Sequence, residues 1–283
     1  MLRPFRGIRQ IQRWHSNGVV KMAYVRHGDV TENTPFVICH GLFGQKQNWN
    51  SVGKALAKRM GTPVYAIDFR NHGESPWTKE HTYPLMAEDL AVFLEDVAKE
   101  TGQNKINLLG HSMGGKVVSY LALHPQLNGS LNKLIVEDIS PHRESSESLF
   151  LGYVDALQKV NLKQERAQIL EQLEDVIPDL TVRQFLLTNL IRSKDGFRWK
   201  MNLEAIGGAL SHILSFKLVE KAFDGPVLFI YGGRSDYFLE QDKPQVKILF
   251  PNVQFEVIPD TGHWLHAENP QLFMDKVVDF LQT

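Results

Sequence analysis

The sequence predicts an α/β fold, in which a mostly parallel β-sheet is covered by helices on both faces. Short apolar runs alternate with helical patterns from Val19 to the C-terminus. The runs are almost fully apolar, as expected for strands that are buried on both faces. A chain of 283 residues is long enough to bury such a core without disulfides, and it holds one cysteine, Cys39.

Seven of these runs are predicted strands. The first, VVKMAYVRHGD at residues 19–29, is expected to form half of an antiparallel hairpin with the residues before it. The other six cover residues 36–39, 63–68, 106–110, 134–138, 227–233 and 254–259. Helical patterns separate most of them, at residues 51–59, 83–100, 113–123, 244–250 and 270–281.

One long interval breaks this alternation. Between Pro141 and Leu218 no strand is predicted, and the segments are helix-like, among them SLFLGYVDALQKV and QERAQILEQLEDV. Active sites of open α/β sheets lie at the carboxyl ends of the strands. We therefore expect one domain at residues 17–283, with an inserted helical cap at about residues 143–217 over that edge.

The N-terminal segment MLRPFRGIRQIQRWHS has a composition of its own. Arginines recur every three or four residues with apolar residues between them, and the first acidic residue is Asp29. The segment lacks the continuous apolar run of a secretory signal or a membrane span. We expect residues 1–16 to be a mitochondrial presequence, with a basic tail as the alternative, and the protein to be located in the matrix. The net charge of −1 favours neither nucleic acid nor an anionic surface as a partner, and no transmembrane segment is expected.

The segment Gly110-His111-Ser112-Met113-Gly114 follows a predicted strand and opens a predicted helix. A G-x-S-x-G motif in this position is typical of a nucleophile elbow. The glycines remove side chains that would clash in so tight a turn, and the helix N-terminus offers free N–H groups to an oxyanion. The predicted nucleophile is Ser112, with a simple helix N-cap as the alternative.

A serine nucleophile needs a general base, and His263 is the candidate. It lies in PDTGHWLHAENP, between the last predicted strand and the last helix, and therefore at the same sheet edge as Ser112. His266 is expected to pack against the sheet or to cap the last helix. The loop HGLFG follows the first parallel strand, so the backbone N–H groups of Leu42 and Met113 are the expected oxyanion donors.

Two residues could supply the acid that orients the histidine. Asp138 in LIVEDISP and Asp236 in YGGRSDYF follow the two strands expected to lie between those of the nucleophile and the base. Glu137 should point to the opposite side of its strand. The pattern alone leaves both aspartates open.

A third polar motif, DFRNHGES, contains Asp68, Arg70 and His72 directly after a strand. We expect these side chains to hydrogen-bond to one another and fix their loop. Neither a metal nor a cofactor is expected.

The motifs HGLFG, DFRNHGES, GHSMGGK, VEDISP, YGGRS and GHWLHAENP, in this order, resemble the α/β-hydrolase superfamily. More narrowly, they are similar to the mitochondrial abhydrolase-domain proteins, the yeast ethanol acetyltransferases and small bacterial esterases. The resemblance implies an eight-stranded, mostly parallel sheet with a helical cap. It also implies that Asp138 is the acid and that Ser235 contacts the histidine, while Asp236 beside it remains the alternative acid.

These residues predict a serine hydrolase that cleaves carboxylic esters through an acyl-enzyme. The resemblance implies lipid, acylglycerol or short acyl esters as substrates. An alcohol acyltransferase that makes esters from acetyl-CoA and ethanol would use the same residues and is the first alternative. A second alternative, also implied by the resemblance, is a binding or protective partner of mitochondrial 2-oxoacid dehydrogenase complexes.

Overall fold

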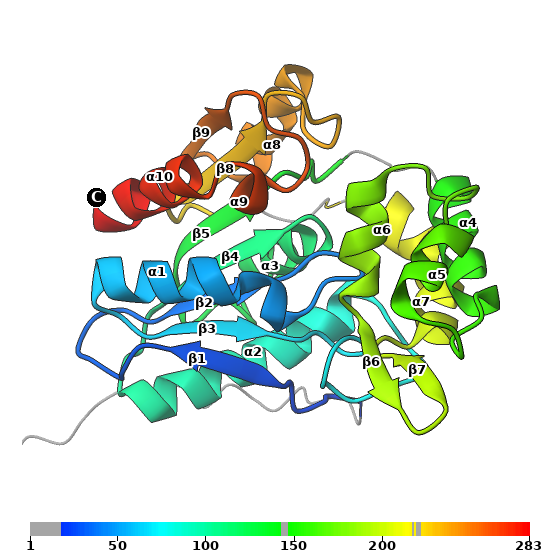
Figure 1. The fold of residues 1–283 in the computed structure, drawn as a ribbon. Coiled ribbons are helices and arrows are strands. Elements are labelled where there is room, and N and C mark those ends of the chain that lie inside the picture. Colours follow the sequence, from blue (N-terminus) through cyan, green and yellow to red (C-terminus); the bar gives the residue numbers. More distant parts are fainter. Residues whose placement is uncertain (1–17, 143–146, 217, 219–221) are drawn as a thin grey trace, which may run out of the picture.

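The computed structural model describes residues 18–142, 147–216, 218 and 222–283 (Figure 1). The strands of its main sheet are β1 (Tyr24–His27), β2 (Phe36–Cys39), β3 (Val64–Ile67), β4 (Ile106–His111), β5 (Leu131–Glu137), β8 (Val227–Gly232) and β9 (Val253–Ile258). Their spatial order is β1-β3-β2-β4-β5-β8-β9. β1 is antiparallel to β3, and the other neighbouring pairs are parallel. The predicted α/β fold class is confirmed.

This sheet has seven strands in the described part of the chain, one fewer than expected. The antiparallel partner expected before Val19 would fall mostly in residues 1–17, which lie outside the described residues. The predicted strand itself begins at Tyr24, because side chains bind the backbone before it. The N–H of Val20 donates to the Asp89 carboxylate over 2.8 Å, and the N–H of Ala23 donates to the Ser75 hydroxyl over 2.8 Å. Backbone donors that are satisfied in this way are no longer free to form a strand ladder.

Helices cover both faces of the sheet (Figure 1). One face carries α1 (Asn50–Met60), α9 (Leu265–Glu268) and α10 (Pro270–Gln282), and the other carries α2 (Tyr83–Thr101), α3 (Met113–Leu123) and α8 (Lys243–Leu249). Two short 3₁₀ helices are η1 (Lys46–Trp49) and η2 (Glu240–Asp242). Successive side chains of a strand point to opposite faces, so Val37 joins one hydrophobic core and Ile38 joins the other.

The helices and strands between β5 and β8 lie together at one end of the sheet, on the right of Figure 1. The described ones form α4 (Glu147–Lys159), α5 (Arg166–Gln172), α6 (Leu180–Leu187), β6 (Leu190–Ser193), β7 (Gly196–Trp199) and α7 (Leu203–Ser215). We call residues 147–216 the cap. The β6–β7 hairpin corrects the expectation of a purely helical segment. Each of its strands has four residues, and an alternating pattern this short cannot be told from a helical turn.

The proposed presequence, residues 1–16, lies outside the described residues. Within the described ranges, no helix combines the length and the apolar composition that crossing a membrane requires.

Candidate active site

Ser112 occupies the sharp turn between β4 and α3. Its backbone has φ 54° and ψ −120°, a conformation that is unfavourable for a residue with a side chain. Two glycines make the turn possible. A Cβ atom at Gly110 would lie 2.3 Å from the carbonyl oxygen of Gly114, and one at Gly114 would lie 2.5 Å from that of His40. The turn has the geometry of a nucleophile elbow.

The carboxylate that binds the His263 ring is that of Asp138, directly after β5. Its Oδ2 lies 2.7 Å from His263 Nδ1. The same oxygen accepts a hydrogen bond from the Ser235 hydroxyl, and Oδ1 accepts one from the N–H of Gly232 over 3.0 Å. Asp138 is 1% exposed, whereas the alternative acid, Asp236, is exposed. The geometry therefore brings together Asp138, Ser235 and His263. Ser235 was expected to contact the histidine, but its hydroxyl bonds to the acid.

A second carboxylate–histidine pair lies next to the first. Glu137, the residue before Asp138, points to the other side of its strand, as expected, and its Oε1 lies 2.8 Å from His266 Nδ1. The Trp49 ring stacks on His266 with 4.0 Å between the ring centroids. His266 is buried, but its bond to Glu137 was not predicted. The sequence signal for this second pair was the adjacent acids Glu137 and Asp138 together with the two histidines of GHWLH.

His111 holds the backbone of the loop that carries His263. Its Nε2 lies 2.9 Å from the His263 carbonyl oxygen. Because a carbonyl only accepts, Nε2 must carry the proton. Burial, together with the nearby His263 and His266, lowers the pKa of His111 well below its usual value, so the ring stays neutral. Hydrogen bonds thus hold the His263 loop at the His263 carbonyl and at the His263 and His266 side chains.

His111, Glu137 and His266 also offer ligand-type atoms within 4.8 Å of one another. In this arrangement His266 Nδ1 is bonded to Glu137, and His111 Nε2 is bonded to the His263 carbonyl. We therefore interpret the three side chains as a hydrogen-bonded support of the loop.

The loop after β2 brings Gly41 and Leu42 to the pocket that Ser112 also lines. A Cβ atom on Gly41 would lie only 3.0 Å from the Ser112 Cβ. The carbonyl of Gly41 accepts a hydrogen bond from the N–H of Gly44 over 2.9 Å. Because the Gly41–Leu42 peptide is planar and trans, the Leu42 N–H points in the opposite direction. Met113 is the first residue of α3, where backbone N–H groups lack intrahelical acceptors.

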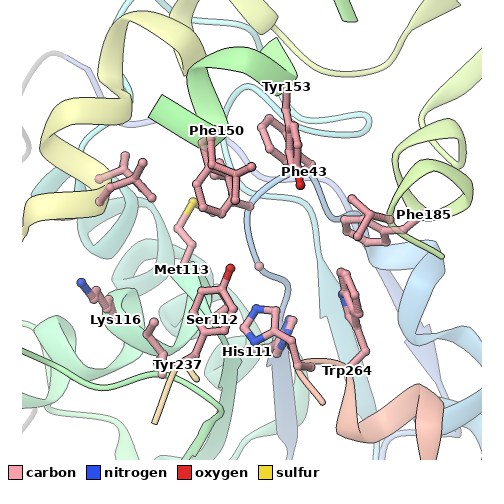
Figure 2. Close-up of a pocket in the computed structure, with 18 of the residues that line it drawn as sticks. Phe43, His111, Ser112, Met113, Lys116, Phe150, Tyr153, Phe185, Tyr237 and Trp264 are labelled. Carbon is pink, nitrogen blue, oxygen red and sulfur yellow. Dashed lines mark hydrogen bonds between the residues drawn. The ribbon is translucent and has the colours of Figure 1, made fainter. Parts of the chain in front are cut away.

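Ser112 and His263 line the same pocket beneath the cap, and its volume is about 240 Å³. On one side, Figure 2 shows aromatic side chains of α4 and α6, namely Phe150, Tyr153 and Phe185. On the other side it shows residues from the sheet edge, namely His111, Ser112 and Trp264. The cap therefore supplies apolar walls opposite the serine.

The chain matches the α/β hydrolase fold family model over residues 34–270. It is also 39% identical to the sn-1-specific diacylglycerol lipase ABHD11 of Danio rerio over 258 residues, which are 89% of this chain and 79% of that protein. The chain belongs to the α/β-hydrolase family. The resemblance found in the sequence is thereby confirmed.

Two further comparisons cover nearly all of this α/β hydrolase. A probable alcohol acetyltransferase of Saccharomyces cerevisiae is 32% identical, over 94% of this chain and 83% of that protein. The solved structure of a marine microorganism esterase is 34% identical with a TM-score of 0.82, and the match covers 92% of this chain and 99% of the other.

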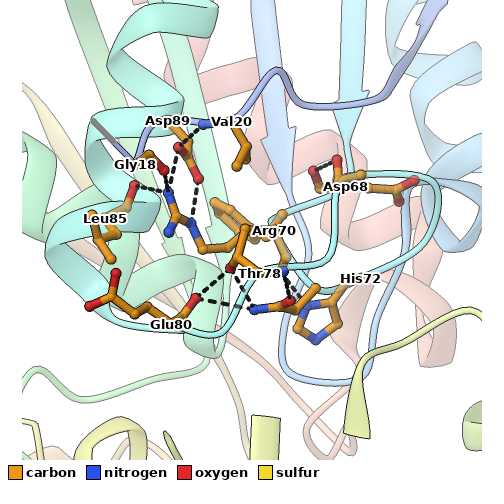
Figure 3. Close-up of polar contacts among 12 residues, drawn as sticks. Gly18, Val20, Asp68, Arg70, His72, Thr78, Glu80, Leu85 and Asp89 are labelled. Atoms are coloured by element: carbon orange, nitrogen blue, oxygen red, sulfur yellow. Dashed lines mark hydrogen bonds and ion pairs between the residues drawn. The ribbon is translucent and has the colours of Figure 1, made fainter. Parts of the chain in front are cut away.

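The DFRNHGES loop of this α/β hydrolase is fixed mainly by partners outside the motif. Arg70 pairs with Asp89 of α2 over 2.7 Å (Figure 3), and Asp68 pairs with Lys46 over 2.5 Å. Within the motif, His72 Nδ1 donates to the Arg70 carbonyl over 3.1 Å. Hydrogen bonds therefore do fix the loop, but most of the side chains bind distant residues and not one another.

Proposed function

We propose that this protein is a serine hydrolase that cleaves carboxylic esters, with Ser112 as nucleophile, His263 as base and Asp138 as acid. The observation that carries the proposal is the 2.7 Å contact between Asp138 and a histidine that lines the same pocket as a serine in a nucleophile elbow. The esterase and lipase relatives support the same reaction class.

The proposed reaction passes through an acyl-enzyme. Asp138 accepts the Nδ1–H of His263, which leaves Nε2 free to take the proton of the Ser112 hydroxyl. The serine oxygen attacks the ester carbonyl carbon, and the resulting oxyanion is held by the N–H groups of Leu42 and Met113. The intermediate collapses and expels the alcohol, which receives the proton from His263. Water, deprotonated by the same histidine, then attacks the acyl-serine and releases the acid.

The size and the lining of the pocket support an acyl chain as its occupant. Its volume of about 240 Å³ lies below the range of roughly 300–1,000 Å³ that is usual for sites of drug-sized ligands. One short or medium acyl chain is therefore a better match than a complete two-chain lipid. An acylglycerol, as in the name of the Danio rerio relative, would bind with its second chain outside the pocket.

The test combines covalent labelling with a panel of substrates. We expect a fluorophosphonate probe to label the wild type and Ser211→Ala, which changes an exposed serine of the cap, but not Ser112→Ala. p-Nitrophenyl butyrate and octanoate should be cleaved faster than the palmitate. Labelling or ester cleavage that persists in Ser112→Ala would contradict the proposal.

An alcohol acyltransferase is the second candidate, and the yeast relative named a probable alcohol acetyltransferase favours it. Both reactions use one acyl-enzyme and differ in whether water or an alcohol attacks it. Measuring ester formation from acetyl-CoA and ethanol beside ester hydrolysis ranks them. Ester formation that clearly exceeds hydrolysis would replace the first candidate.

We further infer a mitochondrial location from the basic N-terminal segment, residues 1–16. Import and cleavage by isolated mitochondria would test it, with the chain that lacks these residues as the control. Binding to a 2-oxoacid dehydrogenase complex is a further proposal. It would account for the function if Ser112→Ala fully restored the phenotype of a deletion.

A further inference from the structure

The loop that carries Leu42 contains a residue in a strained conformation. Residues 41–44 form a turn that is closed by the hydrogen bond between the Gly44 N–H and the Gly41 carbonyl, and Phe43 has φ 61°. A positive φ at the third residue is typical of a type II turn and favours glycine there. With phenylalanine the Cβ atom crowds the following carbonyl, so contacts outside the turn must stabilise it.

Residues outside the turn bind both polar groups of the Phe43 backbone. Its N–H donates to His72 Nε2 over 3.2 Å, and its carbonyl accepts from Asn189 Nδ2 over 2.7 Å. His72 Nδ1 donates to the Arg70 carbonyl, so Nε2 is the unprotonated acceptor. Burial lowers the pKa of His72 to about 3, which keeps the ring in this neutral form.

Asn189 brings the cap into this arrangement. It follows α6, is fully buried, and accepts a hydrogen bond at its carbonyl from the Lys200 N–H over 2.9 Å. The carbonyl of the preceding residue, Thr188, accepts a second bond from Gln45 Nε2 over 2.8 Å. The cap thus holds the turn at the Phe43 carbonyl and at the Gln45 side chain.

We propose that Asn189 is a positioning residue for the oxyanion hole, because it holds Phe43 in the conformation that keeps the Leu42 N–H directed at the reacting oxygen. The inference rests on the proposed function. Its consequence is that the cap has two roles: it lines the acyl pocket and it completes the oxyanion hole. A donor that is needed mainly in the transition state raises kcat and leaves KM nearly unchanged.

The test replaces Asn189 by leucine, which has a similar size and no donor. Removing an oxyanion donor outright lowers kcat by about 10²–10³-fold. In Asn189→Leu the donor is only misplaced, so we expect kcat for p-nitrophenyl butyrate to fall by roughly 10–100-fold. The KM should stay within about threefold of the wild-type value. Butylboronic acid, which forms a tetrahedral adduct with a catalytic serine, should bind more weakly by a similar factor. Asn161→Leu makes the same change at an exposed site of the cap and should behave as the wild type.

An unchanged kcat in folded Asn189→Leu would overturn the proposal. So would a variant that loses thermal stability or raises KM while its boronate affinity stays normal, because that result indicates a purely structural role. If the leucine variant does not fold, Asn189→Ala takes its place, because alanine fits the buried site and has no side-chain donor. Its kcat must fall in the same way. Activity that persists in Ser112→Ala would instead refute the proposed function, so the two failures are distinguishable.

Discussion

Replacing Asp138 by asparagine should remove most of the esterase activity. The Asp138 carboxylate is 1% exposed and accepts hydrogen bonds from Gly232, Ser235 and His263. An asparagine amide would have to turn its NH₂ group toward one of these donors. If His263 then takes the other tautomer, its Nε2 carries a proton and cannot accept the one from Ser112.

A histidine held in the wrong tautomer lowers kcat by about 10⁴, which corresponds to about 5.5 kcal/mol of transition-state stabilisation. Because Asp138 lies behind the His263 ring, KM should change little. The assay is the initial rate of p-nitrophenyl butyrate hydrolysis near neutral pH. The matched control is Asp236→Asn, which makes the same change at an exposed side chain and should stay within about twofold of the wild type.

Two results would refute this reasoning. One is an Asp138→Asn enzyme that keeps more than a tenth of the wild-type kcat. The other is a loss in Asp236→Asn as large as that in Asp138→Asn, which would make Asp236 the acid.

Two further predictions concern the surroundings of the site. Ser235→Ala removes one of the donors to Asp138, so the carboxylate should attract the protonated His263 more strongly. The acid limb of the kcat/KM profile should therefore move to higher pH. A shift of this limb to lower pH would contradict the prediction. Burial lowers the pKa of His40 to about 4 and that of His72 to about 3, from 6.5. The unfolded chain therefore binds more protons below pH 6.5, and each histidine should cost about 2 kcal/mol of stability between pH 7 and pH 5. In urea unfolding, the stability that His72→Gln loses between pH 7 and pH 5 should be smaller than that lost by the wild type, by about 2 kcal/mol. A pH dependence equal to that of the wild type would rule this explanation out.

The alternation of strands and helices and the strand–turn–helix context of Ser112 could be predicted from the amino-acid sequence alone. These features are local: burial on both faces requires continuous apolar runs, and the tight turn requires glycines at positions 110 and 114. The position of His263 also followed from the sequence, because the carboxyl ends of parallel strands meet at one edge.

Which carboxylate lies behind the histidine depends on the three-dimensional arrangement of the strands. Asp138 and Asp236 both follow strands at that edge, and the choice depends on sheet order and on the positive φ of 50° at Asp138, which no local pattern reveals. The contact between Asn189 and Phe43 joins residues 146 positions apart in the chain. Such a contact exists only once the cap has packed over the sheet, because a side-chain hydrogen bond depends on distance in space and not on spacing along the sequence.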